Sequence, residues 1–234
     1  MKVKVFSDGA VLADMLNDLK SGYVTGFTTN PSLMKKAGIT DYIEFAKEVL
    51  THITEYPVSF EVFADDLAVM KEEALKIASL GNNVYVKIPV TNSKGESTAP
   101  IIEELSRAGV KLNVTAIFTL KQVQIVVDAL SEGVPSIVSV FAGRIADTGI
   151  DPEPLMKEAL DICHTKAGVE LLWASCRETF NIYQADRVGV DIVTATPPQI
   201  DKLKMNGKDL EEYSLETVNM FVNDSISLGF SILG

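Results

Sequence analysis

Eight short runs rich in β-branched residues recur along the chain and alternate with longer amphipathic stretches. The runs cover residues 2–8, 23–30, 57–64, 83–90, 111–118, 136–143, 170–176 and 191–197. The stretches at 40–53, 66–80, 99–109, 120–133, 153–168 and 177–189 carry apolar residues at helical spacing. Strands that alternate with helices pair in parallel, because each helix returns the chain to the same end of the sheet. The pattern predicts a (β/α)8 barrel.

Glycines mark the points where helical stretches end and the next apolar run begins. Gly109, Gly133, Gly168 and Gly189 occupy such points, as is typical of helix C-termini. The 234 residues suit one barrel of about 200–250 residues, and no linker or low-complexity tract divides them. We therefore expect a single TIM-barrel domain over residues 1–234, with residues 209–234 as a C-terminal helical tail that ends in apolar residues.

The acidic balance of the chain limits its partners. A formal net charge of −11 argues against nucleic acid, which is bound by clustered Lys and Arg. No apolar run approaches the about 20 residues that span a bilayer, and the N-terminus lacks a signal-peptide core. We expect a cytoplasmic protein that binds neither nucleic acid nor membrane. Cys163 and Cys176 lack metal-ligand spacing, and we assign them no role.

The alternation of side chains along each strand predicts which residues face the barrel axis. In residues 83–90 the valines and Ile88 share the outward face, which turns Lys87 inward. In residues 57–64 the same argument turns Glu61 and Phe63 inward, and in residues 111–118 it leaves Ala116 outward. The other polar residues that this alternation places inside are Asp8, Thr28, Asn30, Ser59, Asn113, Thr115, Ser139, Ser175, Arg177, Thr194 and Thr196.

A lysine inside a barrel requires an explanation. A strand lysine more often reaches solvent, and Glu61 or Asp8 taken alone would more often be a solvated charge or a helix cap. Burying an ammonium, however, costs several kcal/mol by order of magnitude. Polar residues from all the strands converge on Lys87 near the C-terminal strand ends, where barrel active sites lie. This convergence favours chemistry, whereas Tyr85 and Trp173 fit packing roles.

A desolvated amine loses its proton more readily than one in water and can attack a ketone to form a Schiff base. The protonated imine draws electrons from the adjacent carbon, so a neighbouring carbon–carbon bond can break when a base takes the hydroxyl proton. Asp8 and Glu61 could divide these proton transfers. Thr28, Asn30, Thr115 and Ser139 suit the hydroxyls of a dihydroxyacetone fragment. Guanidinium forks suit an anionic group, and the residues for it are Arg144, Arg177 and Ser175.

Five segments resemble one known family, and they occur in the family's order over nearly the whole chain. They are GFTTNPSL at 26–33, VKIPVT at 86–91, LNVTAIF at 112–118, SVFAGRIADTGID at 139–151 and LLWASCR at 171–177. The chain resembles the transaldolases, in particular their short-chain branch, together with the related fructose-6-phosphate aldolases. The resemblance implies no metal and no cofactor.

The resemblance also implies roles for individual residues. Lys87 is implied as the Schiff-base lysine and Asp8 as the acid/base acting on the C4 hydroxyl. Glu61 and Thr115 are implied to orient a catalytic water. The implied contacts to the donor hydroxyls are those of Asn30 and Asn113, and those to the acceptor phosphate are those of Arg144, Ser175 and Arg177.

Two positions bear on the branch of the family. The aldolase branch typically has glutamine where Glu61 stands and tyrosine where Phe141 stands, so both residues resemble transaldolase. The implied reaction transfers dihydroxyacetone from sedoheptulose 7-phosphate or fructose 6-phosphate to an aldose phosphate, as in the pentose phosphate pathway. Cys176, between Ser175 and Arg177, departs from the family pattern and leaves acceptor choice open.

Four alternatives remain at this point. One is a fructose-6-phosphate aldolase, and another is a transaldolase for a sulfosugar such as 6-deoxy-6-sulfofructose. The third is a phosphosugar isomerase that uses Glu61 as its base and Lys87 only as an electrostatic group. The fourth is a sugar-phosphate binding protein. The apolar tail fits burial against another subunit or against its own barrel. With the family resemblance it suggests a homo-oligomer, a pentamer or decamer.

Overall fold

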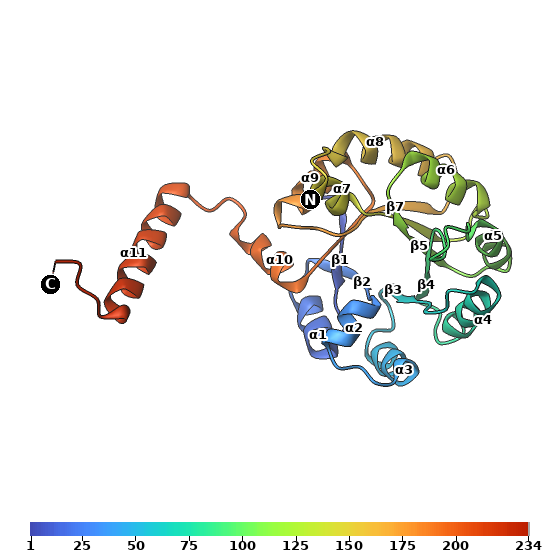
Figure 1. Ribbon diagram of the computed structural model, residues 1–234, viewed down its shortest axis with the longest axis horizontal. Helices are drawn as coiled ribbons and strands as arrows, with labels where there is room; N and C mark the ends of the chain where they lie inside the picture. The colour runs from blue at the N-terminus through green and yellow to red at the C-terminus, as the bar shows by residue number, and fades with distance from the viewer. Residues whose placement is uncertain (234) are drawn as a thin grey trace. The chain divides into compact units, whose positions relative to one another are not determined.

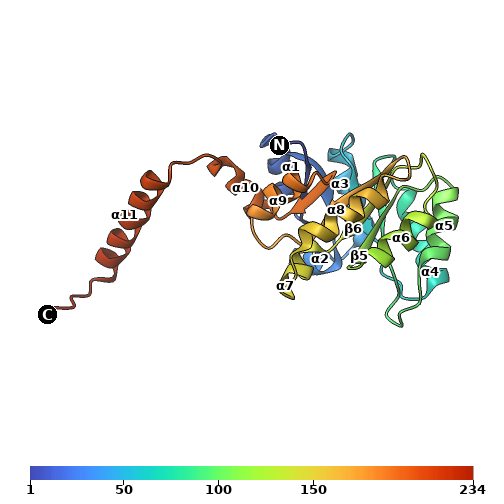
Figure 2. The ribbon, with the colours of Figure 1, turned by 90° about the horizontal axis from the view of Figure 1, so that it is seen from above.

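The computed structural model describes residues 1–233, and parallel strands close into a barrel surrounded by helices (Figures 1 and 2). Each strand pairs with the next in the sequence, and the last pairs with the first. The predicted (β/α)8 barrel is confirmed. The strands are β1 Lys4–Asp8, β2 Val24–Thr28, β3 Val58–Glu61, β4 Val84–Pro89, β5 Leu112–Ile117, β6 Ser136–Val140, β7 Val169–Trp173 and β8 Ile192–Ala195.

The longer helices lie where apolar periodicity predicts them, and side-chain caps fix several of their starts. Asp41, Asp66 and Asp151 accept backbone N–H groups at the first turns of α3, α4 and α8. Helices α1, α2, α7 and α10 were not predicted from the sequence. Three of them, α2, α7 and α10, have only five or six residues, too few to show a helical period. The barrel helices are α1 Leu12–Lys20, α2 Pro31–Lys36, α3 Tyr42–His52, α4 Leu67–Ala78, α5 Ala99–Arg107, α6 Leu120–Ala129, α7 Ala142–Asp147, α8 Pro152–Cys163, α9 Phe180–Val188 and α10 Pro197–Asp201.

The interior of the barrel changes from apolar to polar along its axis. Phe6, Ile137 and Ile192 are buried in one apolar cluster with Leu172 and Ala174. Burying each large apolar side chain stabilises the fold by about 1.5–3 kcal/mol. Asp8, Ser139 and Thr194 follow two residues later on the same strands, so alternation turns them to the same inner face. The apolar layer therefore closes the barrel below a polar layer at the C-terminal strand ends.

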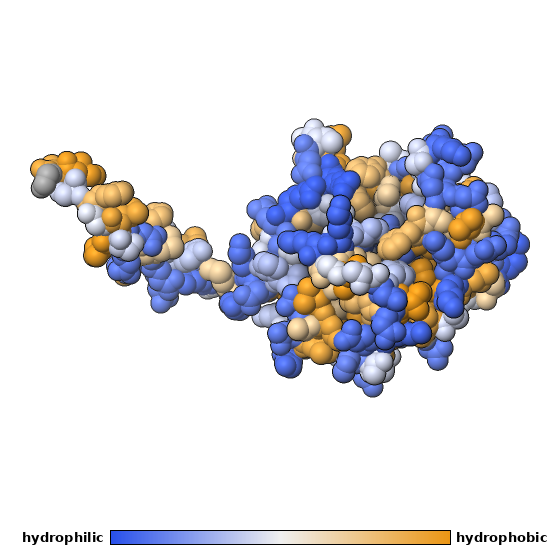
Figure 3. All heavy atoms as spheres, turned by 60° about the horizontal axis from the view of Figure 1, so that its bottom comes forward, coloured by the Kyte–Doolittle hydropathy of each residue, from blue (hydrophilic) through white to orange (hydrophobic). Residues whose placement is uncertain are grey.

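The chain divides into two compact units, Met1–Ile200 with the barrel and a second unit from Asp201 onward. The second unit contains a 3-10 helix, Lys202–Met205, and α11, Leu210–Leu228. No side chain of α11 is buried, and Figure 3 shows apolar residues gathered along it. The tail expected at residues 209–234 is thus helical over most of its length, and Gly234 lies outside the described residues. Within residues 1–233, no helix has the length and apolarity needed to cross a bilayer.

Candidate active site

A cavity of about 480 Å³ opens at the C-terminal ends of the strands. Every site residue expected from the sequence lines it, except Asn113. Those residues are Asp8, Thr28, Asn30, Glu61, Lys87, Thr115, Ser139, Phe141, Arg144, Ser175 and Arg177. The cavity wall also includes residues with no assigned role in the sequence analysis: Pro31, Ser32, Leu33, Ala116, Leu172, Ala174, Cys176, Thr194, Ala195, Thr196 and Gln199. Among the described residues, no group of three His, Cys, Asp or Glu could hold a metal ion.

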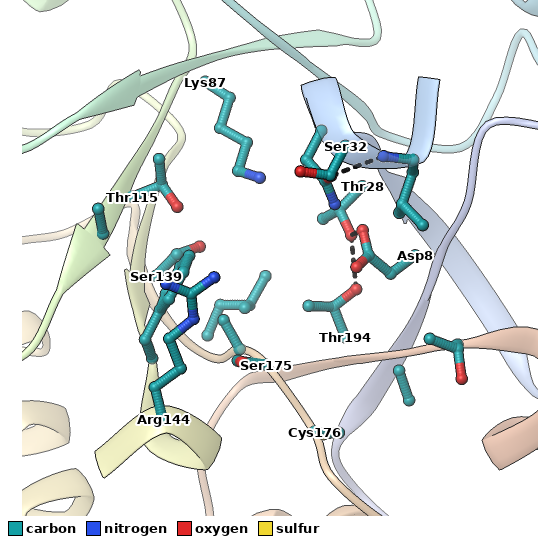
Figure 4. A pocket seen from close by; sticks show the side chains of 18 of the residues that line it. Asp8, Thr28, Ser32, Lys87, Thr115, Ser139, Arg144, Ser175, Cys176 and Thr194 are labelled. Atoms are coloured by element: carbon teal, nitrogen blue, oxygen red, sulfur yellow. Dashed lines mark hydrogen bonds between the residues drawn. The ribbon is translucent and has the colours of Figure 1, made fainter. Parts of the chain in front are cut away.

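Lys87 projects its amine into this cavity from β4 (Figure 4). Its side chain is only 9% exposed. The amine donates to the carbonyl of Thr29 at 3.1 Å and lies 3.2 Å from Oε2 of Glu61. Lys87 and Glu61 stand opposite each other in the β3–β4 register, so the strand pairing itself brings them together. An enclosed amine beside a carboxylate is the arrangement that the sequence predicts.

Glu61 is the last residue of β3, and α3 supports its backbone. The hydroxyl of Tyr42 donates to the carbonyl of Glu61 at 2.7 Å, while the carboxylate faces Lys87. The prediction that Phe63 faces the axis is wrong. Its side chain is 54% exposed and packs on the Tyr42 ring at 4.8 Å, because the strand alternation stops at Glu61.

Asp8 lies at the end of β1 and is hydrogen-bonded to a hydroxyl from β2, which in turn is hydrogen-bonded to a hydroxyl from β8. Thr28 donates to Oδ1 of Asp8 at 2.8 Å, and its oxygen lies 2.6 Å from the hydroxyl oxygen of Thr194. Burial raises the pKa of Asp8 above its usual range. The positive charge of Lys87 and hydrogen bonds from Thr28 and Asn30 oppose that rise. Asp8 therefore keeps its proton to a higher pH than an exposed aspartate does.

A bulge in β5 brings two consecutive residues to the cavity. The β5–β6 register is irregular between Val114 and Ile117, and Ala116 has a φ of 61°. Both Thr115 and Ala116 consequently line the cavity, so the prediction that Ala116 faces outward is wrong. The hydroxyl oxygen of Thr115 is buried and has no hydrogen-bond partner within residues 1–233. This hydroxyl remains available to a bound molecule or a water.

Asn113 does not reach the cavity surface. It is fully buried and connects two serines, accepting from Ser139 at 2.6 Å through Oδ1 and donating to Ser59 at 2.9 Å through Nδ2. The family resemblance implies a contact between Asn113 and the donor hydroxyls. In this structure the side chain instead fixes Ser139, which lines the cavity.

Two arginines lie at one end of the cavity. The Arg144 guanidinium, on α7, stands 5.3 Å from the centre of the Phe141 ring. Arg177 makes a bidentate ion pair with Asp147, with Nε 3.1 Å from Oδ1 and Nη2 bonded to Oδ2. These hydrogen bonds from Arg177 hold the pKa of Asp147 below its usual range. Sequence reasoning missed Asp147, although it stands three residues after Arg144 in a segment already singled out.

Ser175 reaches the cavity through its backbone conformation. Strand alternation was the reason for predicting Ser175 inside, and that reason is wrong. β7 ends at Trp173 and the inward side chains there are Leu172 and Ala174, so a regular strand would turn Ser175 away. Ser175 instead has a φ of 65°, in the left-handed region. A Cβ at Gly143 would lie 1.7 Å from the Ser175 carbonyl oxygen, so only glycine permits this approach. The contact joins the start of α7 to the loop that carries Arg177.

Comparison with known proteins shows the family to which the chain belongs. The family model of transaldolase/fructose-6-phosphate aldolase matches residues 5–232. The chain belongs to this family. A probable transaldolase of Dehalococcoides mccartyi is 36% identical over 194 residues, covering 82% of this chain and 86% of that protein. A probable transaldolase of Brucella anthropi is 36% identical over 218 residues, covering 92% and 94%.

Another relative, a probable transaldolase of Methanococcus maripaludis, is 36% identical over 203 residues, 86% of this chain and 89% of its own. These matches confirm the resemblance found in the sequence. The family model extends over nearly all of the barrel, from residue 5 onward, so the family assignment applies to the barrel and not to a fragment of it.

Proposed function

We propose that this member of the family is a transaldolase that forms a Schiff base on Lys87. It would move a dihydroxyacetone unit from sedoheptulose 7-phosphate or fructose 6-phosphate to an aldose phosphate. One observation carries the proposal: an enclosed lysine amine, 3.2 Å from the Glu61 carboxylate, points into a cavity that Asp8 also lines. Simple binding does not require an enclosed lysine amine, and an isomerase that used Lys87 only as an electrostatic group would form no covalent adduct.

The first step is addition of the Lys87 amine to the ketone carbon. The resulting carbinolamine loses water to give a protonated imine, which requires proton transfers close to the nitrogen. Glu61 is the carboxylate in contact with that nitrogen. The unpartnered Thr115 hydroxyl can hold the water that is released here and consumed when the imine is hydrolysed.

The second step breaks the bond between C3 and C4 of the ketose. Asp8 takes the proton of the C4 hydroxyl, the bond electrons move into the imine, and the aldose phosphate leaves. The remaining enamine attacks the aldehyde carbon of the acceptor, and Asp8 returns its proton to the new oxygen. A carboxyl group whose pKa is raised by burial suits both directions of this exchange.

Arg144, Arg177 and Ser175 are proposed to bind the anionic group of the sugar, with Phe141 beneath Arg144. Thr28, Asn30 and Ser139 are proposed to meet donor hydroxyls, and Asn113 to support Ser139. No cofactor takes part in this scheme.

A sulfosugar remains the second candidate substrate. Asp147 offsets the charge of Arg177, which leaves Arg144 to supply the net positive charge of this end of the cavity. One net positive charge balances a sulfonate monoanion, whereas it balances only part of the charge of about −1.5 to −2 on a phosphate monoester at pH 7. A donor such as 6-deoxy-6-sulfofructose would use the same Lys87 chemistry.

We also propose a cytoplasmic homo-oligomer, a pentamer or decamer, active in pentose phosphate metabolism. The exposed apolar side chains of α11 support the assembly, since apolar patches on this scale usually contact another surface. Size-exclusion chromatography with light scattering would test it against a variant that ends before Asp209.

Product analysis separates transaldolase from aldolase. Fructose 6-phosphate is supplied with and without erythrose 4-phosphate, and glyceraldehyde 3-phosphate, sedoheptulose 7-phosphate and free dihydroxyacetone are measured. We expect glyceraldehyde 3-phosphate to form rapidly only with the acceptor. Equal rates without the acceptor, with free dihydroxyacetone released, would make the protein an aldolase. A parallel series with 6-deoxy-6-sulfofructose ranks the two donors by kcat/KM.

A further inference from the structure

Thr194 stands on β8, directly beside the Asp8–Thr28 pair and across the cavity from Lys87 (Figure 4). β1 lies between β2 and β8 in the closed sheet, with Asp8 opposite Thr28 and with Thr194 opposite Phe6, two residues before Asp8. The Thr194 side chain is almost fully buried and still lines the cavity. The scheme above gives it no role.

The hydrogens of this cluster can be counted. Each threonine hydroxyl has one hydrogen to donate. When Asp8 is ionised it can only accept, so Thr28 gives its hydrogen to Oδ1 of Asp8. The 2.6 Å contact between the two threonine oxygens must then carry the hydrogen of Thr194. The hydrogen bonds therefore run from Thr194 to Thr28 and from Thr28 to Asp8. The Thr194 oxygen can then only accept a hydrogen bond from a molecule in the cavity.

Protonation of Asp8 permits the opposite direction. A proton on Oδ1 can be donated to Thr28, whose own hydrogen can turn to Thr194. The hydroxyl hydrogen of Thr194 is then free to point into the cavity. No bond is broken in this change, and each oxygen still takes part in a hydrogen bond. The Thr194 hydroxyl, which faces the cavity, thus changes from acceptor to donor when Asp8 gains its proton.

We propose that Thr194 is a positioning residue for Asp8. Thr194 fixes the direction of the hydrogen bonds that end at Asp8, and its own hydroxyl changes its hydrogen bonding to the substrate as Asp8 exchanges a proton. The inference rests on the proposed function, because Asp8 must act there as the acid/base. It adds a residue from β8 to a reaction otherwise assigned to β1 through β7 and the loops that follow them.

The test compares two substitutions at Thr194. Thr194→Val keeps the shape of the side chain and removes the hydroxyl, while Thr194→Ser keeps the hydroxyl. Thr25→Val, on the exposed face of β2, is the matched control for a threonine-to-valine change in a barrel strand. Two readouts are used: kcat for the transfer reaction, and the rate of borohydride-trapped adduct formation from dihydroxyacetone, which has no C4 hydroxyl.

We expect Thr194→Val to lower kcat about tenfold, the loss typical of one hydrogen bond, and to leave adduct formation within about twofold. Thr194→Ser should recover most of kcat, and Thr25→Val should match the wild type. An unchanged kcat in Thr194→Val, or an equal fall in both readouts, would overturn the inference. Absence of any adduct in the wild-type protein would instead overturn the proposed function and this inference with it.

Discussion

The two sides of the cavity hold a carboxyl group each, and the two are prepared differently. On the β1, β2 and β8 side, Asp8 is partly buried and accepts from Thr28, whose hydroxyl is bonded in turn to that of Thr194. On the β3, β4 and β5 side, Glu61 forms an ion pair with Lys87, and the Thr115 hydroxyl has no partner within residues 1–233. The hydrogen bonds of Asp8 form before a substrate binds, whereas the Thr115 hydroxyl is left to bond with a bound molecule or a water.

The two arrangements suit two different kinds of proton transfer within one cavity. A carboxyl group inside a hydrogen-bonded chain is suited to exchange one proton with a fixed position on the substrate. A carboxylate beside an amine and an open hydroxyl is suited to chemistry that takes up and releases water. Environments that separate two acidic groups in this way commonly separate their roles. The predictions below test that separation.

The largest effect is expected from Asp8→Asn, which removes the acid/base and keeps the shape of the side chain. Loss of a general base typically costs about 10²–10⁴-fold in rate. We expect a fall of that size in kcat for transfer, measured with saturating donor and acceptor. The borohydride-trapped adduct from dihydroxyacetone should persist. If Asp8→Asn abolished the adduct as completely as the transfer, the two sides of the cavity would not have separate roles.

Glu61→Gln acts on the other side and should change the fate of the intermediate. The amide cannot accept a proton as the carboxylate does, so the balance between transfer and release of dihydroxyacetone should shift. We expect kcat for transfer to fall roughly tenfold and the share of free dihydroxyacetone to rise. The measurement is the product ratio with and without acceptor. An unchanged ratio would remove Glu61 from control of the intermediate.

The stability of Asp8→Asn should depend on pH in a direction set by burial. Because burial raises the pKa of Asp8 in the folded protein, the folded state binds this proton more tightly than the unfolded chain. The stabilisation from protonated Asp8 is full below the unfolded pKa and is lost as pH rises through the folded pKa. Asparagine stays neutral throughout. Thermal unfolding should therefore show Tm of Asp8→Asn rising relative to wild type as pH increases.

Glu61→Gln is the matched control for this stability experiment. It breaks the ion pair with Lys87 and leaves an ammonium without its partner. We expect its Tm to fall at neutral pH, opposite in sign to Asp8→Asn. If both variants raised Tm relative to wild type at neutral pH, or both lowered it, the distinction between the two carboxyl groups would be contradicted.

The smallest effect is expected at the anion end, outside both sides of the comparison. Asp147→Asn should lower KM for an anionic sugar about two- to threefold, the size usual for exposed ion pairs, and leave kcat unchanged. Because Arg177 holds the pKa of Asp147 below its usual range, the ratio of KM between wild type and Asp147→Asn should not vary between pH 6 and 8. Steady-state kinetics at three pH values checks both statements. A change in kcat would indicate that Asp147 also influences the proton transfers.

Strand alternation predicted the site wherever the strands are regular. Lys87 and Glu61 lie within or at the end of ordered strands with buried apolar neighbours, so a period of two gives their direction. Asp8 and Ser139 follow apolar residues of the inner cluster by two positions and face the cavity for the same reason. The barrel itself follows from the number of apolar runs and the helices between them.

The remaining features depend on backbone geometry and on distant partners. The left-handed conformations of Ala116 and Ser175 occur at residues that carry no sequence signal for them. Ser175 depends on Gly143, which is distant in the chain and adjacent only in the folded barrel. The pairing of Arg177 with Asp147 likewise joins the loop after β7 to the end of α7. A pattern read along one strand cannot contain such contacts.

The central claim is that Lys87 forms a covalent imine with the donor sugar. Intact-protein mass spectrometry after borohydride treatment with fructose 6-phosphate tests it directly, comparing wild type, Lys87→Ala and Lys111→Ala, a strand-edge lysine outside the cavity. We predict a dihydroxyacetone-sized adduct on wild type and Lys111→Ala and none on Lys87→Ala. An adduct that survives in Lys87→Ala, or its absence from wild type with fructose 6-phosphate, sedoheptulose 7-phosphate and 6-deoxy-6-sulfofructose alike, would contradict the account.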